Sequence, residues 1–158
     1  MGKHDTTSRF RLRAAVATGL VALGVLAAVG TAQAAAAPAK VKGTPCTVGV
    51  RACVDVDEKK AWLISPAGKI DRGPVSISPG ADDTKTPRGY FRVQWKHKDH
   101  YSKEYDAPMP WSVFFAPGGI AFHEGNLDNP SGGCVRLDED DAKAFYNYLQ
   151  VGNRVQVK

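Results

Sequence analysis

The chain has 158 residues, of which 43% are hydrophobic and 23% charged, and its formal net charge is +5 at pH 7. Much of this positive charge lies in the first 34 residues, and without them 17 basic and 15 acidic residues remain. The rest of the chain is thus only weakly basic and has no Lys/Arg-rich tract, which argues against a nucleic-acid-binding protein, and we expect no nucleic-acid partner.

The N-terminus has the pattern of a segment that directs export. Basic residues between Lys3 and Arg13 precede an apolar run, 14–30, and the small residues of Thr31-Ala32-Gln33-Ala34 follow. This order predicts a signal peptide over residues 1–34, cleaved after Ala34 or a neighbouring Ala, and a secreted, extracytoplasmic protein. The alternative is a retained membrane anchor, but the run is slightly shorter than the roughly 18 apolar residues of a spanning helix and contains glycines. Membrane contact is therefore expected only through this segment, before cleavage.

After the signal peptide, Ala, Pro and Lys dominate residues 35–44, which show no periodic apolar pattern and are predicted to be a linker. Residues 45–158 are enough for one domain with a single core, and we expect a monomer. An exported chain with three cysteines usually has one disulfide and one free thiol. We predict a local bridge between Cys46 and Cys53 and a free Cys134, while a bridge from Cys134 to one of the other two remains the alternative.

Most of the domain reads as short strands separated by turn residues. The stretches 53–64 and 69–78 contain several Val, Ile and Leu residues and are joined by Ser65-Pro66-Ala67-Gly68, which predicts a hairpin. Residues 89–96 alternate polar and apolar side chains, as in a strand with one buried face. Two more strands are expected at 112–115 and 120–123, separated by Pro117-Gly118-Gly119.

Only one helix is predicted, near the C-terminus. Asp138 is a suitable N-cap, acidic residues follow in the first turn, and apolar residues recur at helical spacing until Gly152. Residues 153–158 alternate again and predict a closing strand. The expected fold is mainly β, a sandwich or partial barrel with one C-terminal helix packed on it.

One histidine and one cysteine lie close together in a glycine-rich setting, in Phe122-His123-Glu124-Gly125 and Ser131-Gly132-Gly133-Cys134-Val135-Arg136. A thiolate is the reactive form of Cys, and a nearby imidazole can take its proton. The backbone N–H groups of Gly133 and Cys134 are candidates for an oxyanion hole. The segment therefore predicts a cysteine enzyme that transfers acyl groups, with Cys134 and His123 as catalytic residues.

Further residues are candidates for binding substrate. Arg136 can meet a substrate carboxylate, orient the loop, or be a plain solvated arginine. Ser131 either contacts substrate or hydrogen-bonds within its own loop. The stretch 101–111 is predicted as a loop that either acts as a lid, with Tyr105, Met109 and Trp111 as substrate contacts, or is merely an ordered surface loop. His97 and His100 lack a convincing set of further ligands, so we expect no metal and no cofactor.

Three elements of the sequence, taken in order, resemble the L,D-transpeptidase (YkuD-like) catalytic domain family. Thr86-Pro87-Arg88-Gly89-Tyr90-Phe91 matches its T-P-x-G-x-F element, Val75 to Gly80 resembles its V-x-x-S-x-G strand, and His123 with the Ser131 to Arg136 segment matches its histidine and cysteine signature. The resemblance implies a β-rich fold, a Cys134 nucleophile and a His123 base oriented by the carbonyl of Glu124 or Gly125. It also implies a substrate, the peptide stems of peptidoglycan, which the Cys134 thioester would join in 3-3 type cross-links or attach to the wall.

The chain departs from the family pattern at Gly132, where the family usually has a second histidine. A histidine there would assist the thiol if the backbone tolerated it, whereas a left-handed Gly132 would be strained by any side chain. The alternative functions are an L,D-carboxypeptidase, in which water accepts the acyl group, and a catalytically weak peptidoglycan-binding domain. Papain-like enzymes place the cysteine before the histidine, and sortases carry a T-L-x-T-C motif, so neither matches this order.

Overall fold

The computed structural model of the protein describes residues 37–158. The predicted signal peptide and its cleavage site lie outside the described residues. Within residues 37–158, no helix has the length and apolar character needed to cross a membrane.

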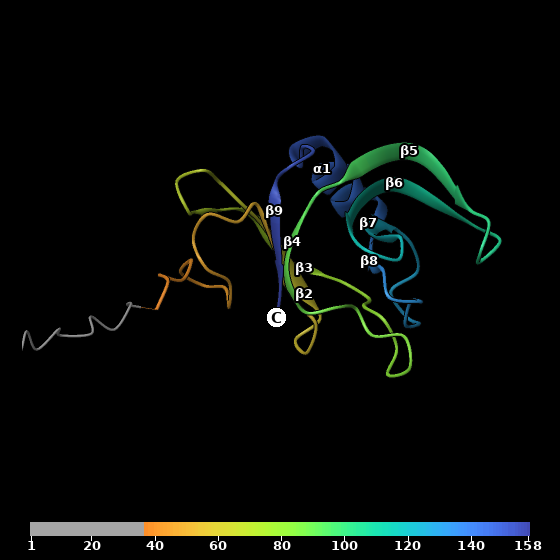
Figure 1. Ribbon diagram of the computed structural model, residues 1–158, viewed down its shortest axis with the longest axis horizontal. Helices are drawn as coiled ribbons and strands as arrows, with labels where there is room; N and C mark the ends of the chain where they lie inside the picture. Colours follow the sequence, from red (N-terminus) through yellow and green to blue (C-terminus); the bar gives the residue numbers. More distant parts are fainter. Residues whose placement is uncertain (1–36) are drawn as a thin grey trace, which may run out of the picture. The chain divides into compact units, whose positions relative to one another are not determined.

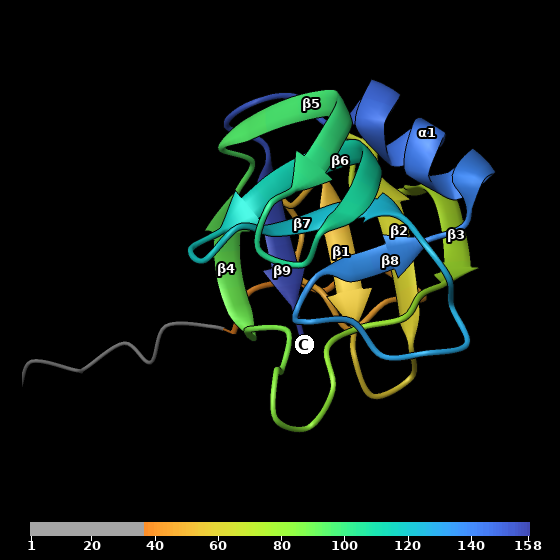
Figure 2. The same ribbon diagram turned by 90° about the vertical axis from the view of Figure 1, so that its right-hand side faces the viewer.

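The described chain forms two β-sheets and one helix, as the sequence predicts (Figure 1). The first sheet has the strand order β3-β2-β1-β9-β4, with β1 (Ala52–Asp55), β2 (Lys60–Ile64), β3 (Ile70–Ser76), β4 (Gly89–Arg92) and β9 (Arg154–Val157). The second has the order β5-β6-β7-β8, with β5 (Trp95–Ser102), β6 (Ala107–Ala116), β7 (Ile120–Glu124) and β8 (Val135–Leu137). Strands β7 and β8 run across the strands of the first sheet (Figure 2).

The main core lies between the two sheets and the helix α1 (Glu139–Tyr148). Its largest fully buried side chains include Phe115, Phe122 and Phe145, which come from β6, β7 and α1. The Phe122 ring lies 4.7 Å from that of Phe115 and 5.1 Å from that of Phe145, measured between centroids. These contacts fix β7, which carries His123, against the rest of the core.

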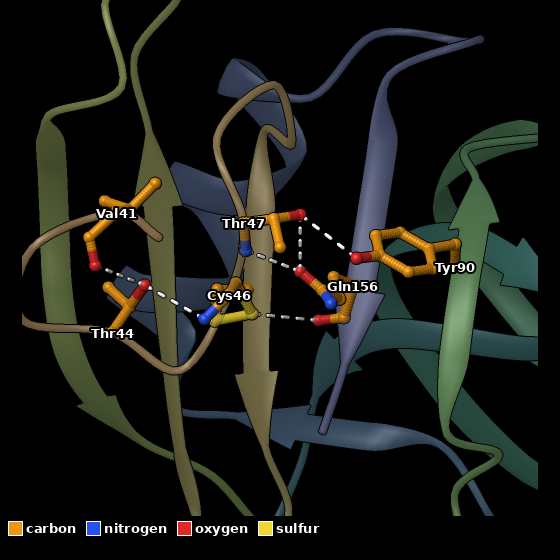
Figure 3. Close-up of a disulfide and its surroundings, with 7 residues drawn as sticks. Val41, Thr44, Cys46, Thr47, Tyr90 and Gln156 are labelled. Carbon is orange, nitrogen blue, oxygen red and sulfur yellow. Dashed lines mark hydrogen bonds between the residues drawn. A yellow bond between two sulfur atoms is a disulfide. The ribbon is translucent and has the colours of Figure 1, made fainter. Parts of the chain in front are cut away.

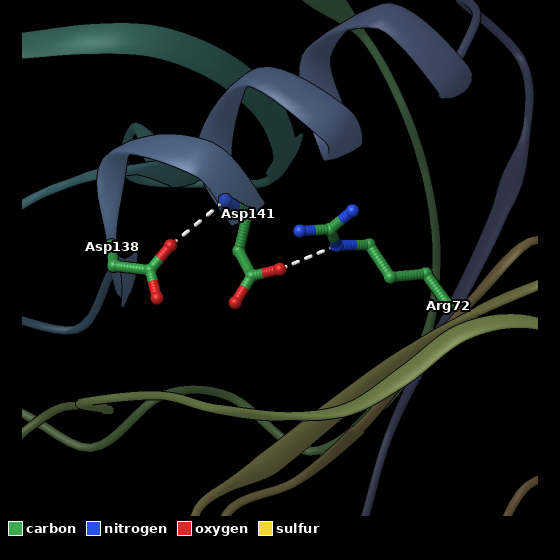
Figure 4. Close-up of polar contacts among 3 residues, drawn as sticks. All are labelled: Arg72, Asp138 and Asp141. Carbon is green, nitrogen blue, oxygen red and sulfur yellow. Dashed lines mark hydrogen bonds and ion pairs between the residues drawn. The ribbon is translucent and has the colours of Figure 1, made fainter.

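The helix begins and ends close to where the sequence predicts. The Asp138 carboxylate accepts a hydrogen bond from the Asp141 backbone N–H at 2.8 Å, which is an N-cap. The buried Asp141 carboxylate also receives the Arg72 guanidinium of β3 at 2.5 Å, so an ion pair joins the edge of the first sheet to the first turn of α1 (Figure 4).

Two predicted strands are divided in the structure. The stretch 53–64 forms β1 and β2 around a tight turn in which Lys59 has a left-handed φ of 52°. The stretch 89–96 is interrupted at Val93 and Gln94, so that β4 joins the first sheet and β5 the second. The first break lies at residues 57–60, which are polar and exposed and which the strand prediction passed over. At the second break the alternation continues, because Val93 is buried between the exposed Arg92 and Gln94, and periodicity alone does not reveal the change of sheet.

The stretch 101–111, which the sequence predicts to be a loop, is largely the tip of a β-hairpin. Strand β5 pairs with β6 from Trp95 opposite Phe114 to Ser102 opposite Ala107. Pro108 and Pro110 lie in the part of β6 that pairs only with β5, since pairing with β7 begins at Val113. Proline is tolerated where a strand has an unpaired edge, which is why its presence here does not exclude a strand.

The segment expected to be a linker is partly folded. Val41 is 2% exposed and packs with Cys46, Cys53 and Trp62 in a small second core. Its backbone N–H donates to the Cys46 carbonyl at 2.9 Å. The domain therefore includes the last residues of the predicted linker. Val41 is the one residue among them that packs in this core, and a single apolar residue makes no periodic pattern from which the packing could be predicted.

The predicted disulfide between Cys46 and Cys53 is present, and Cys134 is free. The loop that holds Cys46 is also attached to β9, because the side-chain carbonyl of Gln156 accepts a hydrogen bond from the Thr47 backbone N–H at 2.7 Å (Figure 3). The Thr47 hydroxyl lies 3.1 Å from the Tyr90 hydroxyl of β4. The disulfide and these bonds hold the N-terminal loop to the first sheet.

Candidate active site

The candidate catalytic residues come from two neighbouring parallel strands. Strands β7 and β8 pair with Phe122 opposite Val135 and His123 opposite Arg136. Cys134 immediately precedes β8, so the loop from Gly125 to Gly133 returns the chain to the side of His123. The sheet therefore brings together the histidine and cysteine that the sequence singles out.

A cavity of about 430 Å³ lies over this pair. Six of the predicted site residues line it: Cys134, His123, Ser131, Arg136, Tyr105 and Met109. Trp111 does not line it. Its backbone has a left-handed φ of 59°, and its ring lies 5.6 Å from that of Tyr146 in α1.

His123 is buried and held in one tautomer. Its Nδ1 lies 2.6 Å from the Glu124 carbonyl oxygen, which can only accept a hydrogen bond. Nδ1 therefore carries the proton and Nε2 carries the lone pair that a general base needs. Burial lowers the pKa of His123 to about 4, with smaller contributions from the charges of Arg136 and His100, so the ring is neutral at neutral pH.

The Cys134 thiol is protonated at rest. Its Sγ donates to the Gly119 carbonyl at 3.7 Å. Burial raises the pKa of the Cys134 thiol, although a backbone hydrogen bond from Ala121 and the positive charge of Arg136 act in the opposite direction. The resting pair is therefore a neutral thiol and a neutral imidazole rather than a thiolate and an imidazolium.

Ser131 serves its own loop. Its side chain is 4% exposed, and its hydroxyl donates to the Cys134 carbonyl at 2.5 Å and accepts the Gly133 N–H at 3.0 Å. Of the two alternatives that the sequence leaves open, these contacts favour hydrogen bonding within the loop. They also occupy the Gly133 N–H, which is therefore not available to an oxyanion in this conformation, whereas the sequence predicts that it is.

Thr86 and Gly80 support the loop that carries Gly133, and the sequence prediction assigns neither of them a role in the site. The buried Thr86 hydroxyl donates to the Gly133 carbonyl and accepts the Gly80 N–H, each at 2.9 Å. A Cβ at Gly80 would lie 2.0 Å from the Thr84 carbonyl oxygen and 2.9 Å from the Gly133 Cα, so no other residue fits. The signal was present, because both residues belong to the sequence elements on which the family resemblance rests.

Arg136 closes one side of the cavity. Its Nη1 donates to the carbonyls of Asn129 and Pro130, each at 3.3 Å, which orients the guanidinium. Three further N–H bonds of the five remain for a ligand. A second cavity of about 360 Å³ opens on Cys134 from another side, between the β5–β6 hairpin and the Gly118–Ile120 turn.

Comparison with known proteins agrees with this geometry. The family model of the L,D-transpeptidase catalytic domain matches residues 49–157. No curated protein matches the sequence. The L,D-transpeptidase from Stackebrandtia nassauensis is similar, with 30% identity over 70% of this chain and a TM-score of 0.65.

Two mycobacterial structures share the fold at lower identity. The L,D-transpeptidase from Mycobacterium smegmatis is 23% identical over 72% of this chain, with a TM-score of 0.63. L,D-transpeptidase 3 from Mycobacterium tuberculosis, solved with a faropenem-derived adduct, is 19% identical over 70% of this chain, with a TM-score of 0.63. The matches span 55%, 60% and 60% of these three solved chains, less than two thirds of each.

Proposed function

Because the chain belongs to the L,D-transpeptidase catalytic domain family, we propose that it is an exported acyltransferase that joins peptidoglycan stem peptides through a Cys134 thioester. The product is a 3-3 type cross-link or an attachment to the wall. One observation carries the proposal: Cys134 and His123 line one cavity, and the Glu124 carbonyl leaves His123 Nε2 as a proton acceptor.

The first half-reaction acylates the enzyme. The Cys134 side chain turns from Gly119 into the cavity, its Sγ attacks the carbonyl carbon of the residue before the terminal D-amino acid, and its proton passes to His123 Nε2. The Cys134 N–H is the backbone donor that we assign to the oxyanion, since the Gly133 N–H is bound to Ser131. The tetrahedral intermediate then expels the amine of the D-residue, which takes the proton back from His123.

The second half-reaction consumes the thioester. An amine of a neighbouring stem attacks the thioester carbonyl and gives a proton to His123, the C–S bond breaks, and the thiolate regains that proton. Arg136 can hold the carboxylate of the leaving D-residue in the first half-reaction, since N–H groups of its guanidinium remain free of the loop. Water in place of the amine would give the trimming reaction of a carboxypeptidase.

Export to the cell wall fits this substrate. The Cys46–Cys53 disulfide favours an oxidising compartment, and the N-terminal pattern predicts cleavage near Ala35. Intact-mass measurement of protein collected outside the cytoplasm tests this part of the proposal. A mass that includes residues 1–34 would contradict it.

The catalytic proposal is tested with defined tetrapeptide stems and with faropenem. Wild-type protein is expected to form cross-linked dimers and to gain the mass of a faropenem adduct on Cys134, and Cys134→Ala is expected to do neither. Since general-base transfer typically contributes about 10²- to 10⁴-fold, His123→Gln should retain at most about one hundredth of the wild-type rate.

His97→Ala is the matched histidine control, because His97 lies on β5 and lines neither cavity. It should retain wild-type activity. His100→Ala is unsuitable as a control, since His100 lines the second cavity together with Cys134. Wild-type protein that forms an adduct but no dimer and no trimmed peptide would contradict the proposed reaction.

A further inference from the structure

An aromatic ring occupies the space beside Gly132. A Cβ built on Gly132 would lie 2.7 Å from both Cζ and the hydroxyl oxygen of Tyr105, and 2.9 Å from its Cε1. The backbone of Gly132 is not left-handed, unlike that of Gly133 at φ 116°. A side chain at position 132 would therefore have to displace the Tyr105 ring, while the backbone conformation of Gly132 itself does not call for glycine.

The ring comes from a distant part of the chain. Tyr105 lies at the tip of the β5–β6 hairpin, where its backbone N–H donates to the Ser102 hydroxyl at 3.2 Å. Its own hydroxyl lies 3.5 Å from the Gly132 carbonyl oxygen, which is the outer limit of a hydrogen bond. Contact between the ring and the glycine, more than this weak bond, holds the hairpin tip to the nucleophile loop.

Both residues of this contact line two adjoining cavities. Five residues line both the cavity of about 430 Å³ and the one of about 360 Å³: Ser102, Tyr105, Met109, Gly132 and Cys134. Met109 is buried, and Cys134 packs against the apolar cluster to which Met109 belongs. Tyr105, by contrast, is 57% exposed.

We propose that Tyr105 is a positioning residue of the active site, which seats its ring on Gly132, divides the cleft at Cys134 into two cavities and shields the thiol. The consequence for catalysis rests on the proposed function. A thioester on Cys134 would meet its acceptor through one cavity while Tyr105 limits access of water. Hydrolysis would break the same C–S bond and form a C–O bond, with the proton returning to sulfur.

The contact between the Tyr105 ring and Gly132 is tested without peptidoglycan, by the rate at which iodoacetamide alkylates Cys134. Tyr105→Ala removes the ring, and Gly132→Ala adds a Cβ that displaces it, so each should raise the rate by about threefold or more. Because both act on one contact, the double variant should alkylate at the rate of Tyr105→Ala alone. Tyr105→Phe keeps the ring and should restore the low rate.

Tyr90→Ala is the matched control, since Tyr90 is 52% exposed on β4 and lines neither cavity; thermal unfolding confirms that every variant folds. The inference is overturned if Tyr105→Ala alkylates at the wild-type rate, or if the effects of the two substitutions multiply in the double variant. With tetrapeptide stems, Tyr105→Ala should also give a higher ratio of hydrolysed to cross-linked product. If the wild type makes neither product, the proposed function fails, while the alkylation rates still decide the role of Tyr105.

Discussion

At the candidate active site, burial displaces the pKa values of His123 and Cys134 in the directions that leave both side chains uncharged. The pKa of His123 falls to about 4, while that of the Cys134 thiol rises. Charge separation in the resting enzyme would therefore be costly, and proton transfer is expected to accompany attack on the substrate. A neutral thiol also resists unwanted alkylation and oxidation.

This arrangement predicts an unusual pH dependence for acylation. In the wild type the base is free above a pH of about 4 and the thiol stays protonated through neutrality, so the faropenem acylation rate should be flat from about pH 5 to 8. His123→Gln must react as the thiolate, and its rate should rise about tenfold per pH unit over the same range. Stopped-flow acylation measures both profiles. A wild-type rate that also climbs tenfold per unit would remove His123 from the proton transfer.

The same group links stability to pH. Because the pKa of His123 is about 4 when folded and near its ordinary 6.5 when unfolded, the unfolded state binds more protons between these values. The free energy of unfolding is therefore highest above pH 6.5, and it falls by about 3 kcal/mol as the pH falls towards 4. Urea unfolding at several pH values should show this loss in the wild type beyond that of His123→Gln. Parallel curves for the two proteins would contradict the burial of a neutral His123.

At the scale of residues, the types of side chain indicated the candidate chemistry, whereas the tertiary contacts of those side chains could not be predicted. Cys134, His123 and Arg136 could be proposed from the sequence because few residue types supply a nucleophile, a base and a carboxylate ligand, and the structure places all three at one cavity. The sequence does not show that the Trp111 ring lies against Tyr146 of α1 and away from the cavity, because that contact joins residues far apart in the chain. The contact of Tyr105 with Gly132 spans 27 residues, and no local pattern encodes it.

At the scale of elements, the ion pair between β3 and α1 is the clearest tertiary link outside the core. Its carboxylate, on Asp141, is 7% exposed, and a buried carboxylate that loses its partner keeps the cost of desolvation. Arg72→Met should therefore lower the free energy of unfolding by about 2 kcal/mol. Denaturant unfolding at neutral pH measures it.

The matched control is Arg88→Met. Arg88 pairs with Asp57 at 2.6 Å, but 75% of the Asp57 side chain is exposed, so the loss should stay within about 0.5 kcal/mol. Equal effects of the two substitutions would show that burial of Asp141 does not strengthen its ion pair.

Elements whose ends are marked by capping residues in the sequence could be predicted. Elements that form only by pairing with a distant strand could not. The helix carries its N-cap in the sequence, and α1 begins directly after Asp138 as predicted, although it ends at Tyr148, with Leu149 as its C-cap, before Gly152. Strand β8 has three residues and no period, and it exists only because it pairs with β7. The tip of the β5–β6 hairpin was predicted as a loop because of its two prolines, which the unpaired edge of β6 accommodates.

At the scale of the whole domain, the loop that contains Val41, Cys46 and Thr47 is attached to the first sheet. The loop is held by the Cys46–Cys53 bridge, by Val41 in the second core, and by the bonds between Thr47 and Gln156. The domain is small, so a cross-link is a substantial part of its stability. In an oxidising compartment the bridge persists, whereas a reducing one would remove it.

Opening this bridge should therefore weaken the whole domain in one cooperative transition. The cysteines are 7 positions apart, and closing a loop of that length removes enough chain entropy from the unfolded state to stabilise the fold by about 2 kcal/mol. We expect Cys46→Ser/Cys53→Ser to lower the free energy of unfolding by that amount, which appears as a lower urea midpoint. The measurement is made in a Cys134→Ala background, so that thiol exchange with Cys134 cannot contribute. In that background, adding a reductant should reproduce the shift in the parent protein and leave the double variant unaffected; a reductant that shifts both would mean that the effect does not come from the bridge.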